Sequence, residues 1–347
     1  MKKVLIIVPE LKKPGGVAAL FNILKIEQNY SNISLFILSN KLPLFLRLPM
    51  KYIEFIIKIQ SVGLVHLNPS LNRKSFLRDS LFAWLTLLFS KKLVVYWHGW
   101  DETYEKKIIN NAFLKWVLKR TFLKAQVTIV LGKLFKSKLC KFGYNNRIVI
   151  ETNSAENKYI INQHPKNINK SELINLLFLS RLEKVKGVYI AIETLRILNR
   201  NKQKYRLLIA GSGKEEEKIK VIIADDKSIE WVGYVTEISK HNLLERSNLM
   251  FFPSEHPEGL PLTLLEGMMY GLPILSRPVG GIPDIIINGE NGYLLESLEP
   301  KDYASKIKEL VDSNYEYNRI SENNIEKSKI FHPENVRLRL NAIYDQI

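Results

Sequence analysis

Two carboxylates in the second half of the chain have the spacing most suggestive of chemistry. Glu258 lies in a loop rich in glycine and proline, and Glu266 follows eight residues later in a stretch typical of a helix. Eight helical residues rise about 12 Å, which is too far for an acid–base pair on one bond but suits the two ends of an extended ligand. We expect the amides of Gly259 and Leu260 to open a helix N-terminus, where N–H groups and the helix dipole attract phosphate.

A pair of cations, Arg181 and Lys186, follows an aliphatic run at 176–179. Two cations in the loop after a strand, beside a glycine that lets another backbone approach, suit a leaving diphosphate. Taken without its context, the same pair fits a solvated surface loop equally well. A second glycine-rich loop runs from Gly211 to Lys214. It fits neither the dinucleotide-binding fingerprint nor the P-loop spacing, so by itself it is weak evidence for a nucleotide site.

Two further candidates lie in the N-terminal half. Gly16 belongs to a glycine pair that opens a predicted helix, and His98 follows the fourth predicted strand. A tight turn is an alternative explanation for the glycines, and a lone histidine after a strand is more often structural. The sequence has no Asp-x-Asp motif and no Cys/His cluster with ligand spacing, so we expect no bound metal. The single cysteine, Cys140, excludes an internal disulfide and fits a reducing compartment.

Short aliphatic and β-branched runs alternate with segments of helical periodicity, which indicates an α/β protein with parallel sheets. The strands expected in the first half lie at 4–8, 34–38, 64–67, 93–97, 127–131 and 148–150. Those expected in the second half lie at 176–179, 206–210, 229–232, 249–252, 273–275 and 293–295. Helices are expected at 133–141, 189–199, 215–223, 239–246, 262–270 and 333–347. Such sheets bind ligands at the carboxyl ends of their strands, so we expect the ligand-binding residues in the loops that follow strands.

The chain is expected to form two doubly wound, Rossmann-like domains. The stretch 154–171 loses hydrophobic periodicity and gains Asn, Lys and His-Pro, as a connection between domains does. We therefore predict one domain at 1–160 and a second at 161–332. The helix expected at 333–347 would then pack back on the first domain.

The spacing of Glu258 and Glu266 resembles the Glu-x7-Glu hallmark of the retaining GT-B glycosyltransferases of the group-1/GT4 type. The resemblance is continuous over roughly 174–296 and includes matching segments at 178–187, 210–213, 271–273, 280–286 and 288–292. It implies two Rossmann-like domains facing across a cleft, the first binding the acceptor and the second the nucleotide sugar. The implied reaction is hexosyl transfer (EC 2.4) from a nucleotide-diphosphate donor with retention of configuration.

The resemblance also implies roles for the candidates in the C-terminal half. Glu258 would bind hydroxyls of the donor sugar, and Glu266 would bind the ribose hydroxyls. The amides of Gly259 and Leu260 would cradle the diphosphate. The expected donor is a UDP-sugar, with a GDP-sugar next, and no cofactor besides this substrate is expected.

Other residues match the family around the phosphates and the acceptor. Arg181 and Lys186 match its basic pair, which neutralises the pyrophosphate, and Gly211 lies in a matching glycine loop. Gly16 matches a position that approaches the donor phosphate from the N-terminal domain. His98 matches a histidine near the transferred sugar and the acceptor. Asn153 stands where the family usually has Pro-Asn-Gly, but the proline and glycine are absent, which leaves its role open.

The positive charge of the chain is confined to its first half. Residues 1–160 hold 26 Lys and Arg against 9 Asp and Glu, whereas residues 161–347 hold 25 against 26. This asymmetry indicates an anionic partner for the first half. The segments 73–92 and 106–124 interleave cations with aromatic residues, as membrane-surface helices do. The alternative is that these aromatics are core and the lysines merely solvated.

No uncharged apolar stretch approaches the roughly 18 residues that span a bilayer. We therefore expect a cytoplasmic protein that binds peripherally at the inner face of the cell membrane and acts on a lipid-linked saccharide. By resemblance, the setting is bacterial surface-polysaccharide synthesis. Two other functions stay open, a nucleotide-sugar epimerase of the same fold and a nucleic-acid-binding protein that uses the basic half. The second lacks a recognition-helix or RNA-binding motif and leaves the two glutamates unexplained.

Overall fold

The computed structural model describes residues 3–12, 15–38, 44–160, 164–169, 172–201, 204–256 and 259–347. The chain forms two compact units. The first consists of Met1–Ser154, Pro257–Leu260 and Pro333–Ile347, and the second of Ala155–His256 and Pro261–His332. The C-terminal helix thus belongs to the first unit, although the chain that leads into it belongs to the second.

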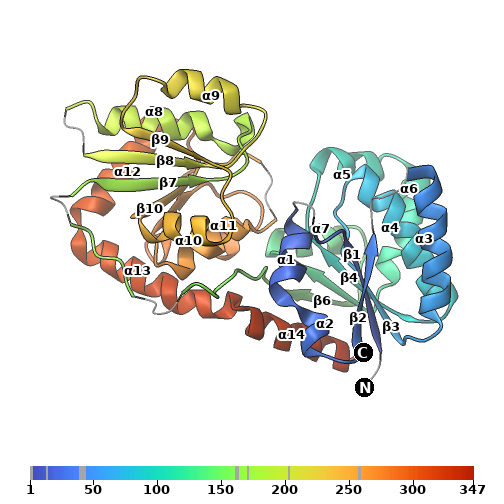
Figure 1. The fold of residues 1–347 in the computed structure, drawn as a ribbon. Helices are drawn as coiled ribbons and strands as arrows, with labels where there is room; N and C mark the ends of the chain where they lie inside the picture. Colours follow the sequence, from blue (N-terminus) through green and yellow to red (C-terminus); the bar gives the residue numbers. More distant parts are fainter. Residues whose placement is uncertain are drawn as a thin grey trace. The chain divides into compact units, whose positions relative to one another are not determined.

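The first unit is built on a six-stranded parallel sheet. Its strands are β1 (Val4–Pro9), β2 (Ile33–Leu38), β3 (Leu64–Leu67), β4 (Lys92–Trp97), β5 (Val127–Val130) and β6 (Arg147–Ile150), in the order β2-β1-β3-β4-β5-β6. The central strands are buried along almost their whole length, as parallel strands covered on both faces must be. Helices flank this sheet (Figure 1).

The connecting elements of the first unit are α1 (Gly16–Leu24), α2 (Ile26–Asn29), α3 (Leu44–Ile59), α4 (Arg73–Leu88), α5 (Glu102–Ile109), α6 (Ala112–Arg120), η1 (Phe122–Lys124), α7 (Lys133–Lys141) and α14 (Pro333–Asp345). Polar side chains set several of the helix starts. Asn72 and Asn111 each accept a hydrogen bond from the amide three residues on, and Asp101 accepts two. These caps place α4 and α5 shortly after β3 and β4, and α6 directly after α5.

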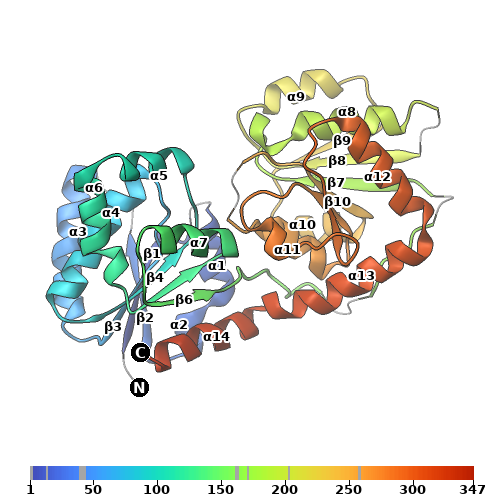
Figure 2. The same ribbon diagram turned by 180° about the vertical axis from the view of Figure 1, so that it is seen from behind.

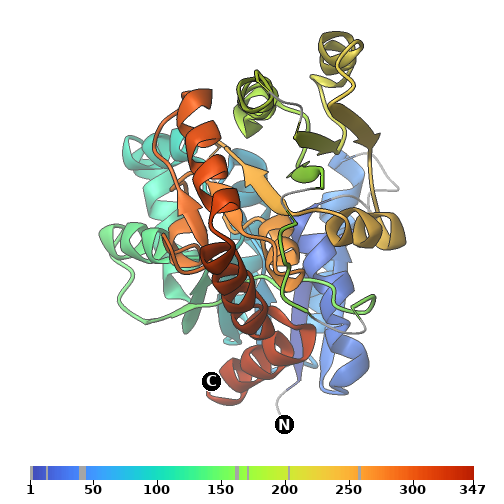
Figure 3. The same cartoon turned by 90° about the vertical axis from the view of Figure 1, so that its left-hand side faces the viewer.

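The order of the strands fixes which face each helix covers. The chain steps one way from β1 to β2 and then the other way from β2 through β6. Because crossovers between parallel strands are right-handed, α3, α4 and α6 cover one face and α1 covers the other. The last helix, α14, packs against α1 (Figures 1 and 3). Arg337 donates to the carbonyl of Leu24 at 3.0 Å, and the Tyr344 hydroxyl lies 2.6 Å from Nδ1 of the buried His66.

The second unit repeats the architecture with a second six-stranded parallel sheet. Its strands are β7 (Ile174–Leu179), β8 (Tyr205–Ala210), β9 (Ile229–Gly233), β10 (Leu249–Phe252), β11 (Ile274–Ser276) and β12 (Gly292–Leu294), in the order β12-β11-β10-β7-β8-β9. Its helices are η2 (Lys184–Lys186), α8 (Val188–Leu198), α9 (Glu216–Ile223), α10 (Glu237–Glu245), α11 (Leu262–Met269), η3 (Ile282–Asp284), α12 (Pro300–Asp312), α13 (Asn314–Ser328) and η4 (Lys329–Phe331). Helices α8 and α12 pack against each other beside the sheet (Figure 2).

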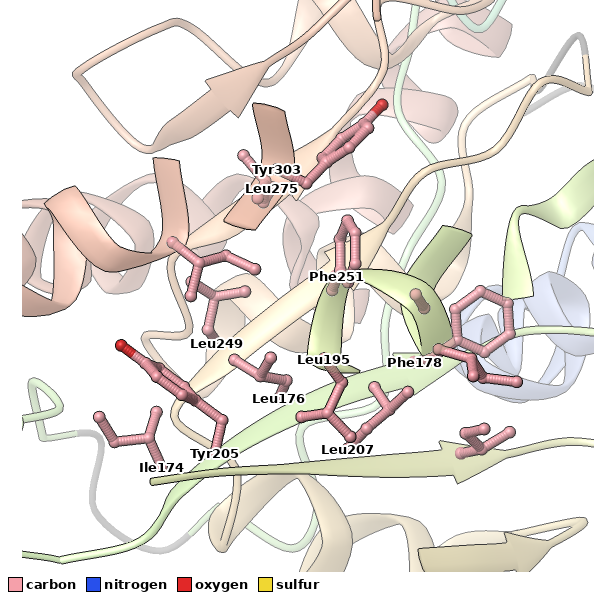
Figure 4. Close-up of a cluster of buried hydrophobic side chains, with 14 of the residues drawn as sticks. Ile174, Leu176, Phe178, Leu195, Tyr205, Leu207, Leu249, Phe251, Leu275 and Tyr303 are labelled. Atoms are coloured by element: carbon pink, nitrogen blue, oxygen red, sulfur yellow. The ribbon is translucent and has the colours of Figure 1, made fainter. Parts of the chain in front are cut away.

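The core of the second unit is a cluster of aliphatic and aromatic side chains from the strands and from α8 and α12. Leu176, Phe178, Leu207 and Phe251 are completely buried within it (Figure 4). At its margin, the hydroxyl of Tyr303 points out of the cluster and donates to the carbonyl of Ser297 at 2.8 Å. The ring of the tyrosine therefore stabilises the core while its hydroxyl keeps a hydrogen-bond partner.

The predicted fold class is confirmed, since both halves are doubly wound parallel sheets. Each expected strand lies within two residues of an observed one, and α7 spans the expected 133–141. Helices α12 and α13 were not predicted.

Candidate active site

Three loops meet at the carboxyl edge of the second sheet, after β7, β8 and β10. The amide of Leu182 donates to Ser212 O at 3.0 Å, and the amide of Glu215 donates back to Leu182 O at 3.0 Å. The amide of Glu255 donates to Val185 O at 2.8 Å. These bonds join the loops at 180–187, 211–215 and 253–256 into one backbone platform.

Two glycines allow the loops of this platform to approach so closely. Gly211 has φ +134°, and a Cβ added there would lie 1.9 Å from the carbonyl oxygen of Ser180. Gly187 has φ +83°, and its Cβ would lie 2.3 Å from the carbonyl oxygen of Pro253. Neither position tolerates a side chain. The structure therefore gives Gly211 a role in loop packing, and its predicted contact with the donor stays a prediction.

The predicted basic pair lies on this platform, with its two members in different environments. Arg181 is largely exposed and forms an ion pair with Glu183 at 2.8 Å. Such surface pairs contribute little to stability, so the guanidinium can exchange this partner for another anion. Lys186 ends the short helix η2 and is only 4% exposed. A lysine so deeply placed at the edge of a sheet is a strong candidate for binding an anion.

Glu266, the second carboxylate of the predicted motif, lies in α11 and is 4% exposed. Lys240 of α10 forms an ion pair with its Oε1. Burial raises the pKa of Glu266 above its ordinary value, Lys240 opposes this shift, and Glu156 adds to it. Lys240 thus offsets part of the cost of burying this carboxylate, and sequence reasoning did not identify it. Its spacing to Glu266 carries no recognisable signal.

Helix α11 begins at Leu262, where the sequence places it, after Pro261. The amides of Gly259 and Leu260 lie just before this start, and their predicted contact with the diphosphate stays a prediction. The carbonyl of Leu260 accepts a hydrogen bond from Asn153 Nδ2 at 2.7 Å. Glu258 lies outside the described residues.

Gly259 is held against the first sheet. A Cβ added there would lie 2.8 Å from the carbonyl oxygen of His98 and 3.0 Å from Leu131. Together with Asn153, this close contact anchors the segment 259–260 beside the end of β4. The position of Asn153, which the sequence left open, therefore has a structural explanation.

His98 follows β4 and is fixed by a neighbouring amide. Its Nε2 lies 2.8 Å from Asn68 Oδ1, and Asn68 Nδ2 donates to Ile7 O at 2.9 Å. Because the second bond orients the amide, Oδ1 must accept from His98, which places the imidazole proton on Nε2. Burial, with a smaller contribution from His66, lowers the pKa of His98 to about 3. The ring is therefore neutral at physiological pH, with Nδ1 as a hydrogen-bond acceptor. Asn68 was not predicted, because its contact depends on two strands being adjacent.

Gly16 is the first residue of α1, and nothing lies within 4 Å of a Cβ added there. Open space at a helix N-terminus lets an anion approach the backbone amides. The structure thus places Gly16 and His98 after β1 and β4 at the carboxyl edge of the first sheet. Arg181, Lys186 and Gly211 lie at the carboxyl edge of the second sheet, followed there by the helix that carries Glu266.

A cavity of about 420 Å³ lies elsewhere in the second unit. It is lined by α8, α12 and the start of β8, and so lies at the amino edge of the sheet. It is therefore separate from the loops that carry the predicted donor residues. Across the described parts of the chain, no three His, Cys, Asp or Glu side chains converge as metal ligands would.

Solved structures with the same arrangement of two doubly wound sheets are GT-B glycosyltransferases. Anabaena HepE in complex with UDP-glucose superposes with a TM-score of 0.76 at 16% identity, covering 100% of both chains. The sucrose-phosphate synthase of Thermosynechococcus elongatus has a TM-score of 0.77 at 16% identity, covering 100% of this chain and 99% of that one. The protein thus has the GT-B fold.

The sequence comparisons name the family. Residues 160–327 match the family described as "Glycosyl transferases group 1". An uncharacterised glycosyltransferase of Methanocaldococcus jannaschii is 24% identical over 98% of this chain and 84% of its own length. The capsular polysaccharide biosynthesis glycosyltransferase CapM of Staphylococcus aureus is 26% identical over 54% of this chain and 49% of its own. Residues 160–327 are therefore similar to a group 1 glycosyltransferase domain, and the chain is a glycosyltransferase.

Proposed function

We propose that the protein transfers a sugar from a UDP-sugar to a saccharide acceptor with retention of configuration. The observation that carries this proposal is the loop platform of the second unit, which presents Arg181 and the buried Lys186. This platform is joined by Glu255 to the chain that leads through Glu258 into α11. A GDP-sugar is the second candidate donor. HepE, which shares the fold, binds UDP-glucose, and this supports the choice of UDP.

The reaction breaks the bond between the anomeric carbon and the β-phosphate oxygen and forms a bond from the same carbon to the acceptor oxygen. The departing diphosphate gains negative charge, which Arg181 and Lys186 stabilise. The acceptor hydroxyl attacks on the face that the diphosphate leaves, and its proton passes to the departing phosphate. Glu266 binds the ribose hydroxyls and Glu258 binds hydroxyls of the sugar. No cofactor or metal is needed, so transfer is expected to persist in EDTA.

His98 positions a substrate hydroxyl in this scheme. Its neutral ring offers Nδ1 as an acceptor, while the bond from Nε2 to Asn68 prevents the ring from rotating. A ring with a pKa of about 3 is a poor general base at neutral pH. It therefore orients the acceptor or the sugar and leaves the proton transfer to the phosphate.

The acceptor is a lipid-linked saccharide of bacterial surface-polysaccharide synthesis, reached from the inner face of the cell membrane. Names of relatives support this setting, among them the capsular enzyme of Staphylococcus aureus and an amylovoran glycosyltransferase of Erwinia amylovora. The positive charge of the first 160 residues supports an anionic membrane surface as the location where the enzyme acts.

Thermal unfolding in the presence of UDP-sugars and GDP-sugars tests the donor. A bound sugar nucleotide at one hundred times its Kd stabilises the fold by about 2.7 kcal/mol, which raises Tm by several degrees. We expect one UDP-sugar to do so in the wild type. Glu258→Ala and Lys186→Ala should each remove most transfer while circular dichroism stays unchanged, and full activity in either variant would contradict the site.

An epimerase of the same fold is the alternative enzyme. Donor consumption measured with and without acceptor separates the two activities, because only an epimerase gives an isomeric nucleotide sugar without an acceptor. Formation of that isomer would contradict the transferase proposal.

A further inference from the structure

Exposed apolar side chains gather on three helices of the first unit. They are spaced three, four or seven residues apart on each helix, so each set forms a single stripe. The stripes are Met50, Ile53 and Ile57 on α3, Leu77, Leu81, Trp84 and Leu88 on α4, and Phe113 and Trp116 on α6. We call these nine side chains the three-helix surface.

The three helices are neighbours on one face of the first sheet (Figure 1). Helix α4 packs against both α3 and α6. The rings of Phe113 and Trp116 stack with their centroids 6.1 Å apart, on the outward side of α6. The stripes therefore lie on adjacent elements and are held in fixed relative positions.

A separate set of aromatic residues fills the inward side of the same helices. Phe82 of α4 lies 5.0 Å from Phe55 of α3, and Phe76 lies 5.4 Å from Phe122 of η1, measured between ring centroids. These four rings are buried. Of the two explanations for the aromatic residues of 73–92 and 106–124, the core explanation therefore applies to Phe76, Phe82 and Phe122. The nine residues of the three-helix surface are not part of this core.

Cations are frequent in the segment that carries α4 and α6. Residues 73–124 contain eleven Lys and Arg against four Asp and Glu. On α6 the exposed Lys115, Lys119 and Arg120 alternate with Phe113 and Trp116, and α6 has no acidic residue. A protein-binding surface is normally depleted in lysine at its centre. A nucleic-acid surface gains nothing from stripes of exposed leucine and isoleucine.

We propose that the three-helix surface docks the first unit on an anionic lipid bilayer. Trp84, Phe113 and Trp116 lie at the headgroup level, where indole and phenyl rings are favoured, and the aliphatic residues of α3 and α4 reach the acyl boundary. Lysines around them pair with anionic headgroups. This inference rests on the proposed location at the membrane and identifies the three-helix surface as the part of the chain that binds there. Within the described residues, no helix has the length and apolar composition of a membrane span, so docking is at the surface.

Vesicle co-sedimentation tests the proposal. The test variant carries Ile53→Gln, Trp84→Gln and Phe113→Gln, one change on each helix. The matched control carries Val221→Gln, Tyr234→Gln and Tyr315→Gln, which are exposed apolar residues of the second unit. Each protein is mixed with vesicles of pure phosphatidylcholine or of phosphatidylcholine with one third phosphatidylglycerol. Tm in buffer and the Tm shift with UDP-sugar are measured alongside, to verify folding and donor binding.

The wild type and the control should bind the anionic vesicles at least tenfold more tightly than the neutral ones. The test variant should lose at least tenfold of that binding while its Tm and donor response stay unchanged. Equal binding by the test variant and the wild type would refute the three-helix surface but leave the membrane location standing. Failure of the wild type to bind anionic vesicles, or salt-sensitive binding to duplex DNA instead, would refute both. The donor response would then still report on the transferase proposal.

Discussion

The ion pair between Lys240 and Glu266 allows a quantitative prediction. In Lys240→Met the carboxylate of Glu266 keeps its buried position but loses its cation. Removing one partner from a buried pair costs about 3–5 kcal/mol. Lys240 is 28% exposed, and Glu266 can escape the cost by taking up a proton. We therefore expect a loss of about 2 kcal/mol at pH 7.5, which lowers the Tm of a unit of this size by roughly 4–8 °C.

The loss should depend on pH with a definite sign. Because burial raises the pKa of Glu266 above 4.5, the folded protein holds a proton that the unfolded chain has already released. This contribution to stability is present at low pH and is lost as pH rises through the folded pKa. Lys240 opposes the shift, so its removal deepens the loss and extends it to higher pH. The difference between Lys240→Met and wild type should thus vanish below pH 4.5 and grow toward neutrality.

Urea unfolding between pH 4 and pH 8 measures this difference. The double variant Lys240→Met/Glu266→Gln should recover at least half of the loss and all of the pH dependence, because no buried charge remains. Lys220→Met provides a control, since Lys220 pairs with one partly exposed and one exposed glutamate of α9, and its Nζ lies 4.1 Å from the Trp231 ring centroid. Removal of this exposed lysine should therefore cost clearly less than removal of Lys240. A pH-independent loss in Lys240→Met would show that the packing of the lysine stem matters, and the electrostatic explanation would be refuted.

Two further predictions concern the loops. Gly211→Ala should destabilise the second unit by about 3 kcal/mol, because its Cβ meets a carbonyl at 1.9 Å and φ is +134°. Gly16→Ala, with open space around it, should leave Tm within about 2 °C, and equal Tm values for the two variants would contradict this reading. The ring resonances of His98 should show the Nε2–H tautomer and no titration between pH 5 and 8, since its pKa is about 3. A titration near pH 6.5 would contradict its assigned environment.

Most of the strands were predictable because they are short runs of residues buried on both faces. Aliphatic runs such as those of β1 and β10 have no amphipathic alternative, so period and length suffice. Helix α13 was not predictable in this way, because it is rich in Asn, Ser and Glu. Tertiary contacts stabilise it: Tyr317 donates to Asn248 O at 2.6 Å, and Asn324 donates to the carbonyls of Leu272 and Asn291 at 2.9 Å. Such contacts involve residues that are distant in the sequence.

The residues of the candidate site were predicted or missed for the same reason, namely whether local sequence or the fold marks them. Arg181, Lys186 and Glu266 were predicted because local spacing marks them. Lys240 and Asn68 were missed, because each acts through a partner 26 or 30 residues away that only the fold brings near. The start of α11 at residue 262 was predicted, whereas the contacts of the loop before it were not. Pro261 ends the extended segment before α11, and the carbonyl of Leu260 is already bound by Asn153 from the first unit's last strand region.

The two units offer anions two physically different surfaces. In the second unit, Lys186 is buried on a backbone platform in which Gly187 and Gly211 pack closely against neighbouring carbonyls. Anion binding there therefore depends on fixed geometry and a low local dielectric. In the first unit, exposed cations such as Lys115 and Lys119 share helix α6 with residues of the three-helix surface, and salt screens each such charge, so that only their sum matters. A compact diphosphate suits the first kind of surface and an extended sheet of lipid headgroups suits the second. Under the two proposals, the charge asymmetry of the sequence reflects the diffuse partner, and the short basic pair of the neutral half reflects the specific one.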